Sequence, residues 1–168
     1  AWVKPYNLNA VQTIMSNTDS AGSSIQLNDC PGSTVTGRVC GIHRADSVGV
    51  STSSTITLSD WMHVATVYDG TETRLYINGV REAVTPLSGS VLGSTFDFLV
   101  GAQPSVNAPG GRDSYFEGEI SQVRLSSVVR YTTDFRPQRE FTSDLNTYGL
   151  WRLDEGQGVA VNDTSGSL

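Results

Sequence analysis

Short runs of alternating apolar and polar residues recur about every eight to fourteen positions along the chain, and Gly, Asn, Asp and Pro separate them. A period of two places every second side chain on the same face of an extended strand. Turn-forming residues at this spacing are typical of antiparallel β-sheets rather than of βαβ units. The pattern predicts strands near residues 10–16, 24–28, 37–43, 47–51, 54–58, 61–69, 72–78, 80–85, 96–101, 115–126 and 147–154.

The clearest local unit runs from Trp61 to Val80 and contains two turn signals. Asp69-Gly70 and Asn78-Gly79 supply residues that adopt positive φ at little cost, which tight hairpin turns require. The segment therefore predicts two successive hairpins, a meander of three strands.

Composition supports an all-β chain of one domain. The 168 residues are 38% hydrophobic and only 17% charged, and 168 residues are enough for one sandwich but few for two domains. Valine, threonine, serine and glycine are abundant, and these residues favour strands and turns. We therefore expect one domain over residues 1–168.

The charge balance excludes several classes of partner. The formal net charge is −6, and the cations are one lysine and ten scattered arginines. A nucleic-acid binder needs clustered Lys and Arg to neutralise phosphates, so no nucleic-acid partner is expected. No apolar run approaches the roughly 20 residues that span a bilayer, so membrane insertion is not expected either.

Cys30 and Cys40 bracket a loop with turn formers at both ends. Closing such a loop with a disulfide removes roughly 3 kcal/mol of conformational freedom from the unfolded chain. A disulfide indicates an oxidising compartment, so we expect an extracellular or cell-surface location. The alternative, a metal site with His43, is disfavoured because the spacing is not that of a zinc knuckle and a fourth ligand is missing.

One long loop, residues 103–114, contains two prolines and two adjacent glycines. Long loops in compact domains are often functional, although a simple connector is an equal alternative. The residues predicted to bind a ligand lie in or beside this loop: Gln103, Asn107, Arg112, Asp113 and Tyr115. The three tryptophans lie in apolar strands and are expected in the core, whereas His43 is expected at the surface.

Taken in order, several segments resemble the laminin G-like branch of the concanavalin A-like jelly rolls. The matching segments are Ala1 to Pro5, Trp61 to Val80, Phe98 to Gly101, Phe116 to Ser126 and Val129 to Pro137. The resemblance implies a two-sheet antiparallel jelly-roll sandwich with one concave face and loops along a rim. It implies no single activity, because function depends on the site that the fold carries.

The chain departs from the family pattern at its C-terminal end. In the family, a strand like Leu150 to Gly156 and a turn like Asp163 to Gly166 come before the strand that begins at Trp2. Residues 147–168 therefore either close the sheet of this domain or belong to a following repeat. The second alternative makes self-assembly through edge strands a hypothesis.

The related glycosidases carry acids at alternate positions of one strand, in the order Glu-x-Asp-x-x-Glu. The nearest string here runs from Glu117 through Glu119 to Gln122. An amide at the last position cannot serve as a general acid, so no catalytic residue is predicted. The resemblance also implies a calcium site, with Asp163 and Glu119 or Glu117 as ligands; the alternative for Asp163 is a simple Asx turn.

These observations favour a non-enzymatic extracellular module that binds a glycan or acts in adhesion. Its expected partners are a glycan or a protein of the cell surface or matrix. The alternative function is that of a structural repeat or filament subunit, which assembles through its edge strands and terminal segments. Calcium is the only cofactor that the sequence suggests.

Overall fold

The structure is a computed structural model of the chain. It describes residues 1–18, 21–30, 33–45, 48–56, 58, 60–158 and 160–166.

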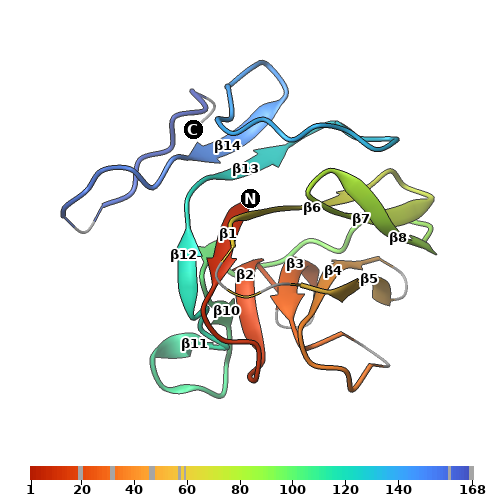
Figure 1. The fold of residues 1–168 in the computed structure, drawn as a ribbon, viewed down its shortest axis with the longest axis horizontal. Helices are drawn as coiled ribbons and strands as arrows, with labels where there is room; N and C mark the ends of the chain where they lie inside the picture. Colours follow the sequence, from red (N-terminus) through yellow and green to blue (C-terminus); the bar gives the residue numbers. More distant parts are fainter. Residues whose placement is uncertain are drawn as a thin grey trace.

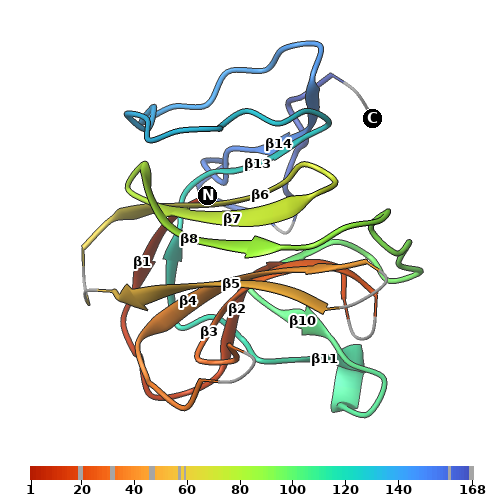
Figure 2. The ribbon, with the colours of Figure 1, turned by 90° about the vertical axis from the view of Figure 1, so that its right-hand side faces the viewer.

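Two five-stranded antiparallel sheets form the fold, which confirms the predicted all-β jelly-roll sandwich (Figures 1 and 2). The first sheet has the strand order β12 (Gly118–Ile120), β1 (Trp2–Pro5), β6 (Met62–Tyr68), β7 (Glu72–Ile77) and β8 (Val80–Pro86). The second sheet has the order β5 (Val48–Thr55), β4 (Arg38–Arg44), β3 (Gly22–Leu27), β2 (Gln12–Ser16) and β9 (Leu99–Val100).

Two strand pairs lie outside these sheets. The first joins β10 (Gln103–Pro104) to β11 (Arg112–Asp113), with a 3₁₀ turn over Pro109–Gly111 between them; the second joins β13 (Val123–Ser126) to β14 (Thr147–Trp151). Figure 2 shows the β13–β14 pair as a further layer over the first sheet, on the side away from the second sheet. The C-terminal strand β14 thus pairs within the same chain.

The predicted meander is confirmed as β6, β7 and β8. Asn78 and Gly79 both have positive φ, at 51° and 83°, as a tight two-residue hairpin turn requires. A side chain at Gly79 would collide with the backbone of Phe135, so this position also needs glycine for space. The turn therefore joins β7 to β8 and lets the 131–141 segment pack closely against them.

The core lies between the two sheets. Met62, Val64 and Leu75 of the first sheet are almost completely buried, and so are Ile25 and Leu27 of the second. Burying an aliphatic side chain of this size contributes roughly 1.5 to 3 kcal/mol. Burial of these side chains between the two sheets thus holds the sheets together.

One end of the sandwich interior is polar. His43 of β4 is only 8% exposed, so its predicted surface position is wrong. Its ring shares hydrogen bonds with the hydroxyls of Ser23, at 2.9 Å, and Thr66, at 3.0 Å, and stacks on Tyr68. These partners come from β3 and β6. The burial of His43 therefore depends on other strands, and the residues next to His43 in the sequence do not indicate it.

The outer face of the first sheet carries an aromatic cluster. The ring of buried His63 contacts Tyr131, Phe135 and Phe141 edge-on, and Tyr76 contacts the first two. Tyr131 and Phe135 stack with their ring centres 3.6 Å apart. This cluster attaches the segment after β13 to the outer face of β6 and β7.

Several predicted strand boundaries differ from the structure. One strand, β5, spans Val48–Thr55, where two strands over 47–51 and 54–58 were predicted; residues 47 and 57 lie outside the described residues. The range 115–126 divides into β12 and β13. β12 pairs with β1 as far as the residues near Trp2, and the chain beyond it pairs with β14 as β13. The range 96–101 keeps only two strand residues, those of β9.

The three tryptophans are half-buried, so the prediction that they lie fully in the core is wrong. The Trp2 indole donates a hydrogen bond to the Gln138 carbonyl, and the Arg139 guanidinium lies over the rings of Trp2 and Trp61. Trp151 stacks on Phe98 at the edge of the core. Trp2 and Trp61 thus each present a ring face to a cation.

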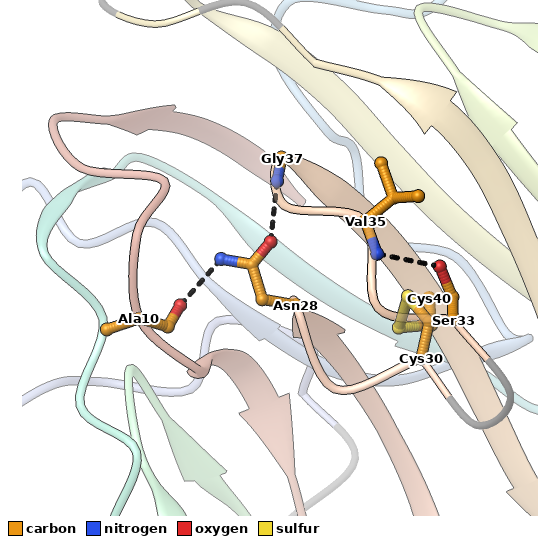
Figure 3. Close-up of a disulfide and its surroundings, with 7 residues drawn as sticks. All are labelled: Ala10, Asn28, Cys30, Ser33, Val35, Gly37 and Cys40. Atoms are coloured by element: carbon orange, nitrogen blue, oxygen red, sulfur yellow. Dashed lines mark hydrogen bonds between the residues drawn. A yellow bond between two sulfur atoms is a disulfide. The ribbon is translucent and has the colours of Figure 1, made fainter.

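The predicted disulfide is present between Cys30 and Cys40, whose Cα atoms are 5.4 Å apart (Figure 3). Asn28 stands before it with φ at 64°, in the left-handed region. Its amide nitrogen donates to the carbonyls of Leu8 and Ala10, and its side-chain oxygen accepts from the Gly37 amide at 2.6 Å. Asn28 therefore connects the disulfide loop to the segment before β2.

Replacing Cys30 and Cys40 together by alanine is expected to lower the free energy of unfolding by roughly 3 kcal/mol, the loop-closure value for a ring of this size. Urea denaturation measures the change. Reductant is expected to lower the stability of the wild-type protein by a similar amount and to leave the variant unchanged. Equal stability of wild type and variant under oxidising conditions would contradict this expectation.

Asn28→Ala is expected to destabilise the fold by about 2 to 4 kcal/mol, because it removes the side-chain hydrogen bonds and strains a left-handed backbone. Asn28→Gly removes the same hydrogen bonds without the strain, so we expect it to cost about 1 kcal/mol less. Urea denaturation of both variants separates the two contributions. The backbone argument fails if alanine and glycine prove equally stable.

Burial lowers the pKa of His43 from 6.5 to about 4. The unfolded chain therefore binds a proton that the folded protein does not, and the stabilising contribution, complete above pH 6.5, is lost as the pH falls from 6.5 to 4. One proton changes stability by at most about 1.4 kcal/mol per pH unit. We therefore expect the free energy of unfolding of His43→Gln, measured by urea denaturation, to fall less steeply between pH 6.5 and 5 than that of the wild type. The difference in slope is expected to be up to about 1.4 kcal/mol per pH unit. Parallel curves for wild type and variant would show that His43 does not titrate in this way.

Candidate functional site

The segment predicted as a long loop, residues 103–114, is instead a short hairpin. Gln103 pairs with Asp113 and Pro104 with Arg112. The tip is closed by hydrogen bonds from the Ser105 amide to the Gly111 carbonyl and from the Gly111 amide to Ala108, both at 3.0 Å. Gly110 and Gly111 have φ values of 77° and 72°, which L-residues with side chains seldom adopt.

The five predicted ligand residues divide into two groups. Asn107, Arg112 and Tyr115 are exposed, Tyr115 to 59%. The Gln103 side chain instead accepts a hydrogen bond from Gln26 of β3, and half-buried Asp113 accepts one from the Ser114 hydroxyl at 3.0 Å. The first three are available to a ligand, and the last two support the hairpin.

A hollow of about 200 Å³ lies beside the hairpin. Its lining residues are Phe96, Asp97, Leu99, Pro104, Gly110, Gly111 and Arg112. Asp97 and Arg112 are exposed, and Phe96 is half-buried. Among the residues that the structure describes, neither Asp97 nor Arg112 takes part in an ion pair.

The side chains of this hollow suit a small polyhydroxylated ligand. An aromatic or apolar surface packs against the C–H face of a sugar, and planar charged groups exchange paired hydrogen bonds with its hydroxyls. Most of the exposed lining is polar: Asp97 can accept and Arg112 can donate hydrogen bonds, and Phe96 and Leu99 add a small apolar part. Pockets for drug-sized ligands begin at about 300 Å³, so a smaller hollow is sized for one sugar ring.

Sequence reasoning identified Arg112 but missed Phe96 and Asp97. The predicted strand over 96–101 includes both residues, but the strand in the structure, β9, comprises only Leu99 and Val100. Gly93 and Ser94 before them were the available signal, because such residues indicate a turn rather than a strand.

A second polar group lies where β12 pairs with β1. Glu119 accepts hydrogen bonds from Lys4, at 3.0 Å, and from the exposed Tyr6 hydroxyl. These bonds lower the pKa of Glu119, which favours the ionised carboxylate, the opposite of what a general acid needs. Gln122 donates to the Arg139 carbonyl and accepts from the Phe141 amide, so it supports the chain after β13.

Asp163 lies beside β14, where it forms an isolated bridge with Trp151. Its carboxylate accepts hydrogen bonds from the amides of Leu150 and Ser165 and from the Ser165 hydroxyl, at 2.7 to 2.9 Å. Burial opposes ionisation, but these hydrogen bonds outweigh it and lower the pKa of Asp163. None of these hydrogen bonds joins Asp163 to Glu119. The calcium site with these two ligands stays a prediction.

Within the described part of the chain, no three His, Cys, Asp or Glu side chains gather as a metal site would require. The described residues also include no helix with the length and hydropathy of a membrane span.

The family described as the concanavalin A-like lectin/glucanases superfamily matches residues 1–134. No curated protein matches the chain significantly.

Two solved structures resemble the chain. One is a protein of Bacteroides ovatus ATCC 8483, provisionally assigned as a carbohydrate-binding protein, with a TM-score of 0.77 and 19% sequence identity. The match covers 99% of this chain and 48% of that one, so the chain spans about half the neighbour's length. The other is domain 4 of AbnA, a GH43 extracellular arabinanase of Geobacillus stearothermophilus, in complex with arabinotriose. Its TM-score is 0.47, its identity 23%, and the match covers 70% of this chain and 53% of that one.

Proposed function

The chain belongs to the concanavalin A-like lectin/glucanase superfamily, and on this premise we propose that it is a non-catalytic, extracellular glycan-binding module. In this proposal the hollow beside the β10–β11 hairpin receives one sugar ring of the glycan. Asn107 and Tyr115, exposed on or beside the same hairpin, extend the contact to neighbouring sugars.

The observation that carries the proposal is the composition of the hollow. It combines half-buried Phe96 with the exposed charges of Asp97 and Arg112 in a space of about 200 Å³. The β10–β11 pairing positions Arg112, which lies opposite Pro104. The provisional assignment of the Bacteroides ovatus neighbour as a carbohydrate-binding protein agrees with this use of the fold.

Two further observations support a secreted binding module. The disulfide between Cys30 and Cys40 favours an oxidising compartment. The pairing of β14 with β13 inside one chain favours a module that closes its own layer over assembly through that strand. Adhesion follows from the same proposal where the glycan belongs to a cell surface or matrix.

A glycan array with the 168-residue protein, with millimolar calcium and again with chelator, tests the proposal. We expect retention on at least one class of neutral oligosaccharide. Binding that is lost with chelator would assign calcium a role, and equal binding would exclude one. No retention on any glycan in either condition would overturn the proposed function.

Arg112→Ala and Asp97→Ala are each expected to weaken binding of the retained glycan at least tenfold, because each removes a charged hydrogen-bonding group from the hollow. Isothermal titration calorimetry measures the change. Arg136→Ala and Asp154→Ala remove exposed charges that do not line the hollow and are matched controls. Equal losses in the controls, or unchanged binding in the first pair, would place the site elsewhere.

A further inference from the structure

Two adjacent glycines, Gly110 and Gly111, line the hollow at the tip of the β10–β11 hairpin. Figures 1 and 2 show this hairpin at the edge of the molecule, away from the N-terminus and from the β13–β14 layer. The pairing of β10 with β11 and the hydrogen bond from the Gly111 amide to the Ala108 carbonyl hold the tip in place. The two glycines therefore form one side of the hollow.

The space beside both of these glycines is open. A Cβ atom on either residue would meet no protein atom within 4 Å. Elsewhere in the fold the protein itself occupies that space, as the Phe135 carbonyl does beside Gly79. Close packing of the chain is therefore not the reason for glycine at the hairpin tip.

Backbone conformation alone does not require glycine at both positions either. The φ values of Gly110 and Gly111 are 77° and 72°, in the left-handed region. Asparagine enters this region more readily than most residues with a side chain. Asn28 and Asn78 do so in this protein, with φ at 64° and 51°. Another reason for bare backbone at this place is the close approach of a ligand, which glycine permits.

The polar groups around the hollow suit a neutral sugar. Among the described residues, no backbone hydrogen bond that leaves the turn engages the amide or the carbonyl of Gly110, so both groups are free for a ligand. Asp97 adds an acceptor and Arg112 a donor, and their opposite charges cancel. A hydroxyl group donates and accepts hydrogen bonds, so it matches this mixture. An acidic sugar would find no net positive charge.

We propose that Gly110 and Gly111 are a wall of bare backbone against which a neutral sugar ring packs, and that the absence of side chains there determines whether the hollow admits the ring. This inference rests on the proposed function and names residues that determine the specificity of the same site. The hollow of about 200 Å³ is smaller than pockets for drug-sized ligands, which begin at about 300 Å³. A side chain at the tip would therefore take space that the sugar needs.

The probes are the neutral trisaccharides cellotriose, maltotriose, xylotriose, mannotriose and galactotriose, with trigalacturonic acid as the acidic comparison. Isothermal titration calorimetry measures their binding to the 168-residue protein. We expect at least one neutral trisaccharide to bind. Trigalacturonic acid is expected to bind at least tenfold more weakly than the best neutral trisaccharide, because the charges of Asp97 and Arg112 cancel.

Gly110→Asn and Gly111→Asn keep a residue that tolerates positive φ but add a side chain at the hairpin tip. Each is expected to weaken binding of the best neutral trisaccharide at least tenfold. Gly166→Asn and Gly156→Asn are the matched controls: these glycines have the same φ values, 77° and 72°, equally open surroundings and no place in the hollow. The controls are expected to bind as the wild type does, and urea denaturation verifies that each variant is folded.

NMR spectra of the isotopically labelled wild-type protein test the contact without any substitution. Addition of the best neutral trisaccharide is expected to shift the amide signals of Gly110 and Gly111. The amide signals of Gly156 and Gly166 are expected to stay unchanged. Shifts confined to residues remote from the hairpin would contradict the wall.

The outcomes separate this inference from the proposed function. No retention on the glycan array would overturn both. If Arg112→Ala weakens binding while Gly110→Asn and Gly111→Asn bind as the wild type does, the hollow remains the glycan site and the wall is wrong.

Three further results would overturn the inference alone. One is an equal loss of affinity in the matched controls, which would assign the effect to the substitution itself. Another is tighter binding of trigalacturonic acid than of every neutral trisaccharide. The last is a protein that an array glycan retains but that binds none of the neutral trisaccharides at millimolar concentration.

Discussion

The central strands of the first sheet, β6 and β7, are covered on both faces, and the positions of the other elements depend on this constraint. Val64 and Leu75 face the second sheet, whereas His63 and Tyr76 face the aromatic cluster after β13. A strand that is buried on both sides requires apolar or hydrogen-bonded side chains at every position. The chain after β13 therefore packs back over β6, and β14 extends that layer.

Local patterns predicted what depends on neighbours in sequence. Asn78-Gly79 determines its own turn, because both residues tolerate positive φ, and Cys30 and Cys40 lie close enough along the chain to indicate a bridge. The burial of His43 and the division between β12 and β13 were not predictable in this way. Both depend on strands far away in sequence, β6 for the histidine and β14 for the division.

Prediction of the candidate site from the sequence is limited in the same way. The composition of residues 103–114 indicated an exposed recognition element, and the hairpin does expose Arg112. The hollow exists only because residues 96–99 approach that hairpin. No local pattern reports this approach, since it follows from the pairing of β9 with β2 and the contacts of β10 with its neighbours.

The segment 96–99 also lies between the hollow and a larger cavity of about 740 Å³ beside β6. Phe96, Asp97 and Leu99 line the hollow, whereas Phe98 lines the cavity along β6 and stacks on Trp151. Along residues 97–99, Phe98 lines the cavity and its two neighbours line the hollow, so side chains of this short segment contribute to both spaces. The hollow and the cavity share no lining residue, so residues 96–99 contribute different side chains to each.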